Sequence, residues 1–209
     1  MSNKKSEILF FGVRSASFGD FCEVAKSLSL NPLYVDNLPK GESQNTETFF
    51  HSNELEKFHF GLPIVISIVT PEYRKIAMLH AIELGFRDFP AFVSPNADIA
   101  SNATVESGVF VNTSSIIGQS AYLARNCVIN RGANVGHDVR IGEFTHVAPS
   151  ACILGSSKIG ANVLVGANST VLHNLEIGPG AVIGAGAVVI HDVLAGQTVV
   201  GNPARVIKD

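Results

Sequence analysis

The sequence predicts a small α/β domain followed by a parallel β-helix, and two observations lead to this prediction. From Val93 to Val189 every sixth residue is Val, Ile or Leu, 17 positions in succession. The first 92 residues lack this period and alternate strand-like apolar segments with helix-like ones. A period of six fits neither the turn of an α-helix nor the alternation of an ordinary strand. It is the hexapeptide signature of a parallel β-helix.

The repeat also assigns roles to the residues between the aliphatic positions. The residue four positions after each aliphatic one is Ala, Ser, Thr, Cys or Val in 16 of 17 repeats, and Leu175 is the exception. Gly directly follows the aliphatic residue in seven repeats. We expect the aliphatic residues to fill the core, the small ones to lie where faces converge, and Gly to serve a positive φ or a close backbone approach. Three repeats per coil give between five and six coils without a large insertion.

The N-terminal domain is expected to span residues 1–92, and the β-helix with its tail residues 93–209. Apolar segments predict strands at 8–11, 32–36 and 63–69, and helical patterns cover 20–28 and 71–84. Thr70 can cap the second helix, with Pro71 at its first position, and Gly85 can end it. The polar stretch 39–48 reads as a surface loop. Alternating strands and helices predict a parallel sheet, which binds ligands beyond the carboxyl ends of its strands.

Composition excludes several classes of partner. The formal charge of −3 and the isoelectric point near 6.1 argue against nucleic acid held by phosphate contacts. No apolar run approaches the roughly 20 residues of a membrane span. The apolar run near the N-terminus is also too short for a signal peptide. We therefore expect a cytoplasmic protein without a membrane partner. Its three cysteines, Cys22, Cys127 and Cys152, are expected to be reduced core thiols.

Histidines are the scarce reactive side chains. At 18 residues per coil, His137, Gly155, His173 and His191 are expected to form one column, with neighbours about 4.8 Å apart. His146 lies nine residues from His137, half a coil away, so the two histidines face different parts of one prism. They can share a site only across a subunit boundary, which makes an oligomer necessary if both are used. A single histidine on a β-helix corner is otherwise a solvated surface residue.

Two motifs carry a more specific resemblance. The segment 130–147, Asn-Arg-Gly-Ala-Asn-Val-Gly-His-Asp-Val-Arg-Ile-Gly-Glu-Phe-Thr-His-Val, resembles the core of bacterial sugar acetyltransferases with left-handed β-helices. The tail Gly-Asn-Pro-Ala-Arg at 201–205 is similar to the terminal Gly-x-Pro-Ala-Lys/Arg of that superfamily. The most similar branch acetylates nucleotide-linked amino sugars, as in bacillosamine and perosamine pathways, and includes sialic acid O-acetyltransferases.

The resemblance implies a left-handed helix, acetyl-CoA as co-substrate, no metal, and a cytoplasmic homotrimer that serves cell-surface polysaccharide synthesis. By position, His137 matches the general base that removes a proton from the attacking amine or hydroxyl. Asp138 takes the place of the acidic residue that orients the base, where the relatives often have the longer Glu. Gly155 matches the glycine whose backbone N–H holds the developing oxyanion.

The remaining positions concern binding. Asn130 matches a polar residue on the substrate side, and His146 matches the histidine near the thioester of acetyl-CoA. A smooth groove for pantetheine and adenine is implied at Gly166, Ala167, Gly184 and Ala185. Each of these four is equally well explained as a corner residue that the fold requires.

The turn after the first strand departs from the family pattern. The relatives have a glycine-rich turn with a histidine, whose backbone amides cradle the nucleotide diphosphate. Here residues 12–19 read Gly-Val-Arg-Ser-Ala-Ser-Phe-Gly. Arg14, Ser15 and Ser17 could bind phosphate through side chains instead, and Asp36 matches an acidic residue near the nucleoside. The alternative is that this site has degenerated or binds another ligand.

The leading hypothesis is therefore an acetyl-CoA-dependent acetyltransferase acting on the amino group, or a hydroxyl, of a nucleotide-activated sugar. One alternative is O-acetylation of a non-nucleotide sugar such as sialic acid. Another is a metal enzyme like the γ-carbonic anhydrases, with His146, His173 and His191 as candidate ligands. A non-catalytic sugar-binding protein is a fourth possibility. The sequence leaves the sugar, the nucleotide and the choice of N- or O-acetylation open.

Overall fold

The computed structural model describes residues 7–36, 49–55 and 59–208, so the loop expected at 39–48 lies outside the described residues. Contacts divide the chain into two compact units. One consists of Met1–Val69 and Tyr73–Pro90, and the other of Thr70–Glu72 and Ala91–Asp209. Each unit is described below by itself.

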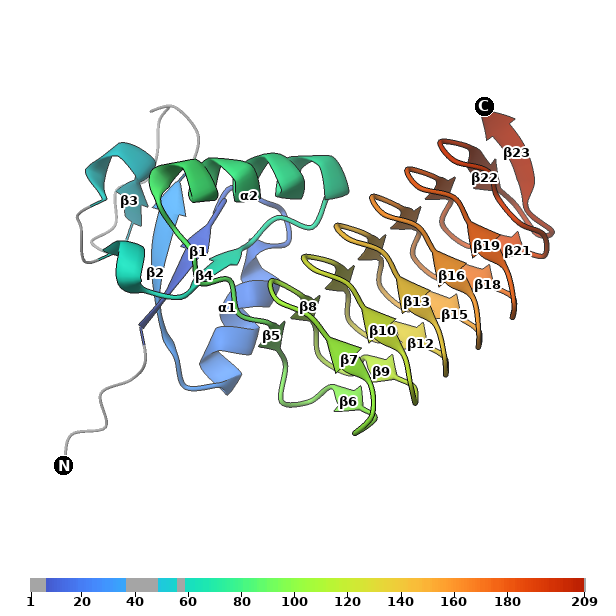
Figure 1. Ribbon diagram of the computed structural model, residues 1–209, viewed down its shortest axis with the longest axis horizontal. Helices are drawn as coiled ribbons and strands as arrows, with labels where there is room; N and C mark the ends of the chain where they lie inside the picture. Colours follow the sequence, from blue (N-terminus) through green and yellow to red (C-terminus); the bar gives the residue numbers. More distant parts are fainter. Residues whose placement is uncertain (1–6, 37–48, 56–58, 209) are drawn as a thin grey trace. The chain divides into compact units, whose positions relative to one another are not determined.

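The first unit contains a parallel sheet with the strand order β3-β2-β1-β4 (Figure 1). Its strands are β1 (Glu7–Phe11), β2 (Asn31–Asp36), β3 (Phe49–His51) and β4 (Ile64–Ile66). Its helices are α1 (Phe18–Ser27), α2 (Pro71–Leu84) and two short 3₁₀ turns, η1 (Ser52–Glu54) and η2 (His59–Gly61). The expected parallel sheet is confirmed. The sequence did not predict β3, which is too short to show an alternating pattern.

Strand β4 is shorter than the apolar run 63–69 suggested. The chain leaves the sheet after Ile66, and the hydroxyl of Ser67 donates to the carbonyl of Phe11 at 3.1 Å. Arg74 of α2, fully buried, donates to the carbonyls of Ile66 and Ile68. The bonds from Arg74 satisfy the backbone oxygens of Ile66 and Ile68, which a longer strand would have paired with a neighbour.

The second unit is the expected left-handed parallel β-helix, a stack of coils without any long excursion between Ile99 and Val189 (Figure 1). It has three faces. The first, called the β14 face, contains β5 (Phe92–Val93), β8 (Phe110–Val111), β11 (Val128–Ile129), β14 (His146–Val147), β17 (Leu164–Val165), β20 (Val182–Ile183), β22 (Thr198–Val200) and, antiparallel at its end, β23 (Arg205–Lys208).

The β12 face contains β6 (Asp98–Ile99), β9 (Ile116–Ile117), β12 (Asn134–Val135), β15 (Cys152–Ile153), β18 (Thr170–Val171) and β21 (Val188–Val189). The β13 face contains β7 (Thr104–Val105), β10 (Tyr122–Leu123), β13 (Arg140–Ile141), β16 (Lys158–Ile159) and β19 (Glu176–Ile177). The chain visits the β14, β12 and β13 faces in turn. The corner between the β12 and β13 faces therefore lies across the prism from the β14 face.

The core follows the repeat. Fourteen of the 17 aliphatic positions are buried in one cluster, and the first three, Val93, Ile99 and Val105, are partly buried against it. Of the cysteines only Cys127 lies in this core. Cys152 occupies the outward position of its strand and Cys22 is half-buried, so the expectation of three core thiols was wrong for these two. All three cysteines are free.

The seven glycines that follow an aliphatic residue have a common cause. A Cβ added to any of them would lie 2.4–2.8 Å from an atom of the next coil, and none has a positive φ. Close approach between coils, rather than corner conformation, therefore requires glycine there. Positive φ occurs instead at the second residue of many corners, where Ser, Asn, Asp or Gly is usual and Phe144, at 57°, is the bulky exception.

The last coil is shorter than the others. Val193 pairs with Ile177, 16 residues earlier, whereas the strands of the preceding coils pair at 18. The corner that carries His191 is the one that loses two residues. The predicted column is therefore regular through His137, Gly155 and His173, and departs from regularity at His191.

Candidate functional site

His137 and Asp138 form a hydrogen-bonded pair on the corner between β12 and β13. His137 Nδ1 lies 2.8 Å from Asp138 Oδ2, and the two side chains are 67% and 59% exposed. Asp138 has a φ of 59°, a left-handed conformation that short polar residues tolerate better than Glu does. Despite its shorter side chain, Asp138 reaches the imidazole from its own corner.

This pairing determines which ring nitrogen can act as a base. A carboxylate only accepts hydrogen bonds, so Nδ1 must carry the hydrogen and Nε2 keeps its lone pair. The exposed ring can therefore receive a proton at Nε2 while Asp138 stabilises the imidazolium that forms. Solvent weakens the charge interaction of so exposed a pair, so its main effect is to orient the ring.

Gly155, one coil further along the same corner, makes room for this ring. A Cβ added to Gly155 would lie 2.4 Å from His137 Nε2 and 2.6 Å from Cε1. Its φ is not positive, and the equivalent corner position one coil later is His173, so the backbone itself accepts a side chain. No hydrogen bond from the Gly155 N–H is found within the described chain, although Ser156 N–H donates to the carbonyl of His137. The corner thus combines an exposed imidazole with a backbone N–H that makes no hydrogen bond within the described chain.

His146 lies on the β14 face, half a coil away, and the structure does not bring it near His137 within one chain. Its side chain projects outward from β14, opposite the core residue Val147, yet it is only 8% exposed. Its Nε2 lies 3.4 Å from the side-chain nitrogen of Asn130. Asn130 is itself 5% exposed, so its expected place on the substrate side is not supported by its burial.

The groove residues fall on the corner between the β14 and β12 faces. A Cβ on Gly166 would lie 2.6 Å from the backbone nitrogen of Ala185, and one on Gly184 would lie 2.7 Å from a methyl carbon of Val200. Coil stacking therefore explains both glycines. Ala167 and Ala185 are half-buried and exposed respectively, so this corner presents small side chains beside the coils.

The predicted substrate residues of the first unit gather at the carboxyl ends of β1 and β2. Arg14 Nη2 and Nε lie 2.5 and 2.7 Å from Asp36 Oδ2, and Asp36 is buried. The two residues were expected to contact different parts of the ligand, but they pair with each other. Ser15 Oγ accepts the N–H of Ser17, the residue before α1, and Ser17 makes no side-chain cap.

The sequence did not single out two further residues. Arg74 is buried beside the end of β4, and Asn112 donates a hydrogen bond to Asn130. The spacing of 18 residues between Asn112 and Asn130 is one coil, so the repeat could have revealed that pair. Nothing in the local pattern of α2 distinguishes Arg74 from a solvated helix residue.

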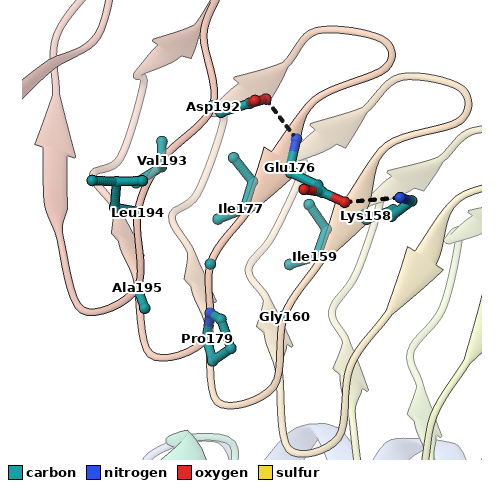
Figure 2. Close-up of a pocket in the computed structure, with 11 residues that line it drawn as sticks. Lys158, Ile159, Gly160, Glu176, Ile177, Pro179, Asp192, Val193, Leu194 and Ala195 are labelled. Carbon is teal, nitrogen blue, oxygen red and sulfur yellow. Dashed lines mark hydrogen bonds and ion pairs between the residues drawn. The ribbon is translucent and has the colours of Figure 1, made fainter.

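An open cavity of about 440 Å³ lies away from these residues, on the β13 face where the last coil is short (Figure 2). Lys158 Nζ lies 2.8 Å from Glu176 Oε1, and the Glu176 N–H donates to Asp192 Oδ1 at 2.8 Å (Figure 2). Pro179 and the exposed Leu194 line the rest of it. Lys158 and Glu176 are thus paired with each other, and the Asp192 carboxylate accepts a backbone N–H.

The described residues of the single chain contain no group of three His, Cys, Asp or Glu side chains placed to hold a metal. His146 and His173, two of the candidate ligands for a metal enzyme, lie on opposite sides of the prism. Among the same described residues, no helix is long and apolar enough to cross a membrane.

Comparisons with known proteins support the fold and the repeat. The family model for the bacterial transferase hexapeptide (six repeats) matches residues 156–191. No curated protein matches this chain in sequence.

Solved structures resemble this chain over nearly its whole length. The acetyltransferase domain of PglB from Neisseria gonorrhoeae, in complex with acetyl coenzyme A, is 23% identical with a TM-score of 0.85, over 97% of this chain and 100% of that one. PerB from Caulobacter crescentus, in complex with CoA and GDP-perosamine, is 21% identical with a TM-score of 0.83, over 97% of each chain. WeeI from Acinetobacter baumannii is 19% identical with a TM-score of 0.67, over 98% and 100%. At these identities the likeness establishes the two-part fold.

Proposed function

We propose that this protein is an acetyl-CoA-dependent acetyltransferase that acts on the amino group, or a hydroxyl, of a nucleotide-activated sugar. The observation that carries the proposal is the His137–Asp138 pair with its free Nε2 above Gly155. The PglB domain and PerB have the same fold and were solved with acetyl coenzyme A, and with CoA and GDP-perosamine. Both support this assignment of donor and acceptor.

The reaction follows from this arrangement. The acceptor's amine or hydroxyl attacks the thioester carbonyl, and His137 Nε2 takes the proton that the nucleophile loses. The backbone N–H of Gly155 donates to the oxyanion of the tetrahedral intermediate. When that intermediate collapses, the C–S bond breaks and the imidazolium returns the proton to the thiolate, giving CoA and the acetylated sugar. Asp138 keeps the hydrogen on Nδ1 throughout.

We propose a cytoplasmic homotrimer whose active sites lie between subunits. His137 and His146 face opposite sides of one prism, so only a neighbouring chain can bring a His146 to a His137. The outward positions of the β12 face, which borders the His137 corner, include Ile116 and Val188, whereas the β13 face presents Arg140, Lys158 and Glu176. The more apolar β12 face is the better subunit contact. The product of the enzyme would serve the synthesis of cell-surface polysaccharide.

The test is turnover by wild type and His137→Ala with acetyl-CoA and a panel of UDP-, GDP- and dTDP-linked amino sugars, followed by release of the CoA thiol. We expect His137→Ala to lower turnover by roughly 10²–10⁴-fold with an unchanged oligomeric state. His173→Ala, an exposed histidine one coil beyond Gly155, is the matched control and should retain activity. Near wild-type turnover in His137→Ala would refute the mechanism, and a stable active monomer would refute the shared site.

One observation favours a second candidate, O-acetylation of a non-nucleotide sugar such as sialic acid. The guanidinium of Arg14 is engaged by Asp36, and the turn 12–19 lacks the glycine-rich cradle of the relatives. Fewer donors then remain for a diphosphate. Release of thiol with free sialic acid, and none with any nucleotide sugar, would select this candidate.

A further inference from the structure

Three buried polar side chains contact one another in sequence along the β14 face. Asn112, Asn130 and His146 are 3%, 5% and 8% exposed. Asn112 Nδ2 lies 3.0 Å from Asn130 Oδ1, and Asn130 Nδ2 lies 3.4 Å from His146 Nε2. Buried polar groups are costly unless they are paired, so a chain of this kind constrains the orientation of each member.

Backbone donors fix the orientation of both amides. The N–H of Thr113 donates to Asn112 Oδ1 at 2.7 Å, and the N–H of Arg131 donates to Asn130 Oδ1 at 2.8 Å. A backbone N–H can only donate, so the atom that it meets must be the amide oxygen. Each side-chain NH₂ therefore points the other way along the chain, from Asn112 to Asn130 and from Asn130 to His146.

The last link decides the state of the imidazole. Because the NH₂ of Asn130 has only hydrogens to offer, His146 Nε2 must accept and cannot carry a hydrogen of its own. We propose that Asn112 and Asn130 are positioning residues that hold His146 as the neutral tautomer with its hydrogen on Nδ1. A protonated Nε2 would oppose N–H to N–H in a buried site, which costs the desolvation of both groups.

This arrangement gives the two histidines different capabilities. Both have the hydrogen on Nδ1, but Nε2 of His137 is open to solvent whereas Nε2 of His146 is occupied by Asn130. His146 therefore has no accepting nitrogen for a substrate proton. Its use toward the thioester rests on the proposed function, whereas the tautomer itself does not.

A purely structural explanation of the same contacts is a ladder of asparagines that stitches adjacent coils. The two explanations differ in what they require of His146. A ladder stabilises the coils whichever ring nitrogen carries the hydrogen, whereas the positioning role requires Nδ1–H and requires that Asn130 determine it.

The experiment is ¹⁵N NMR of the intact protein labelled at histidine nitrogens, with the His146 signals assigned by comparison with His146→Gln. In the wild type at neutral pH we expect Nδ1 to show the shift of a protonated ring nitrogen and Nε2 that of an unprotonated one. Asn130→Asp replaces the NH₂ by an accepting oxygen, so Nε2 should become protonated. Asn31→Asp, the same change at an exposed strand position of the first unit, should leave the His146 signals unchanged.

A wild-type spectrum with a protonated Nε2 would overturn the proposal, as would an Asn130→Asp variant that keeps the wild-type tautomer. The wild-type spectrum alone can overturn the proposal, so a variant that fails to fold leaves it falsifiable. In the activity assay, Asn130→Asp should lower kcat/KM for acetyl-CoA by about tenfold, the low end of what loss of an orienting partner costs a metal-bound histidine. The expected tautomers without acetyl transfer would refute the proposed function and leave the positioning role standing.

Discussion

Gly155→Ala tests the site more sharply than removal of His137, because it adds one methyl group and keeps every polar atom. The new Cβ would lie 2.4 Å from His137 Nε2, whereas an ordinary contact begins at 3.4 Å. The ring must therefore move by about 1.0 Å, the difference between these two distances, or rotate away from Asp138. A misplacement of that size can cost about 10²-fold in rate.

The same substitution should leave the fold unharmed. Gly155 has no positive φ, and the equivalent corner positions in the coils before and after it are His137 and His173. Replacing Gly by Ala at a compatible position stabilises proteins by about 0.4–1 kcal/mol through the unfolded state. We therefore expect kcat to fall by about 10²-fold while the melting temperature stays constant or rises slightly.

The assay is CoA thiol release at saturating acetyl-CoA, with thermal unfolding measured in parallel. The backbone N–H of residue 155 survives the change, so a loss of activity reports on the ring rather than on the oxyanion donor. In a double-mutant cycle, Gly155→Ala should have little further effect in the His137→Ala background. Gly61→Ala, where an added Cβ meets nothing within 4 Å, is the control. Wild-type turnover in Gly155→Ala would refute the packing argument.

The remaining predictions concern side chains that carry a charge or contact one. Asp138→Asn should lower kcat by about ten- to a hundredfold and leave KM for acetyl-CoA unchanged. This loss is smaller than the roughly 10⁴-fold loss at a buried triad carboxylate, because solvent screens the exposed pair. An unchanged kcat would contradict the orienting role of Asp138. Arg14→Ala should lower the melting temperature by depriving the buried Asp36 carboxylate of two donors, and the added change Asp36→Asn should restore it. By calorimetry, Arg14→Ala should also weaken nucleotide-sugar binding by about tenfold, or roughly 1.4 kcal/mol, with acetyl-CoA affinity unchanged; equal affinity would remove Arg14 from the site. The hydroxyl of Tyr122 donates to Glu106 at 2.5 Å and lowers the pKa of that carboxyl in the folded protein. The hydrogen bond therefore stabilises the fold fully above the pKa that Glu106 has in the unfolded chain, and this contribution is lost as pH falls through its pKa in the folded protein. The melting temperature of Tyr122→Phe should therefore lie below that of the wild type at neutral pH and converge with it in acid, and a gap that persists in acid would contradict this assignment.

The β-helix could be predicted from sequence because each inward position repeats at a fixed interval. Burial of one aliphatic side chain per face leaves a signal that is independent of distant residues, and the coil length of 18 then places His137 beside Gly155 without further information. The same arithmetic failed at His191, because the last corner loses two residues. The loss is visible in the sequence, where the next aliphatic core position after Val189 is Val193, four residues on, and not residue 195.

The first unit was less predictable for a related reason. Its strands and helices follow from apolar periodicity, but the contacts at the edge of the sheet join residues at unrelated spacings. Arg14 and Asp36 are 22 residues apart, and only the register of β1 against β2 brings the turn after one to the end of the other. The sequence alone predicted Arg14 as a phosphate ligand, whereas the fold gives its guanidinium a competing partner in Asp36.

The glycines show where sequence and structure carry different information. In sequence, Gly136 and Gly166 directly follow an aliphatic repeat position and Gly155 stands one residue later, but all three lie beside corners. In the structure, the space that a Cβ would fill at Gly136 and Gly166 holds the backbone of the next coil, whereas at Gly155 it holds the imidazole of His137. Where a Cβ would meet the backbone of the next coil, coil stacking requires the glycine. Where a Cβ would meet only an exposed side chain, stacking does not require it, and the site explains the glycine instead. The nearest atom to a missing Cβ therefore separates the two roles, and at position 155 that atom is His137 Nε2, the nitrogen that we propose as the proton acceptor.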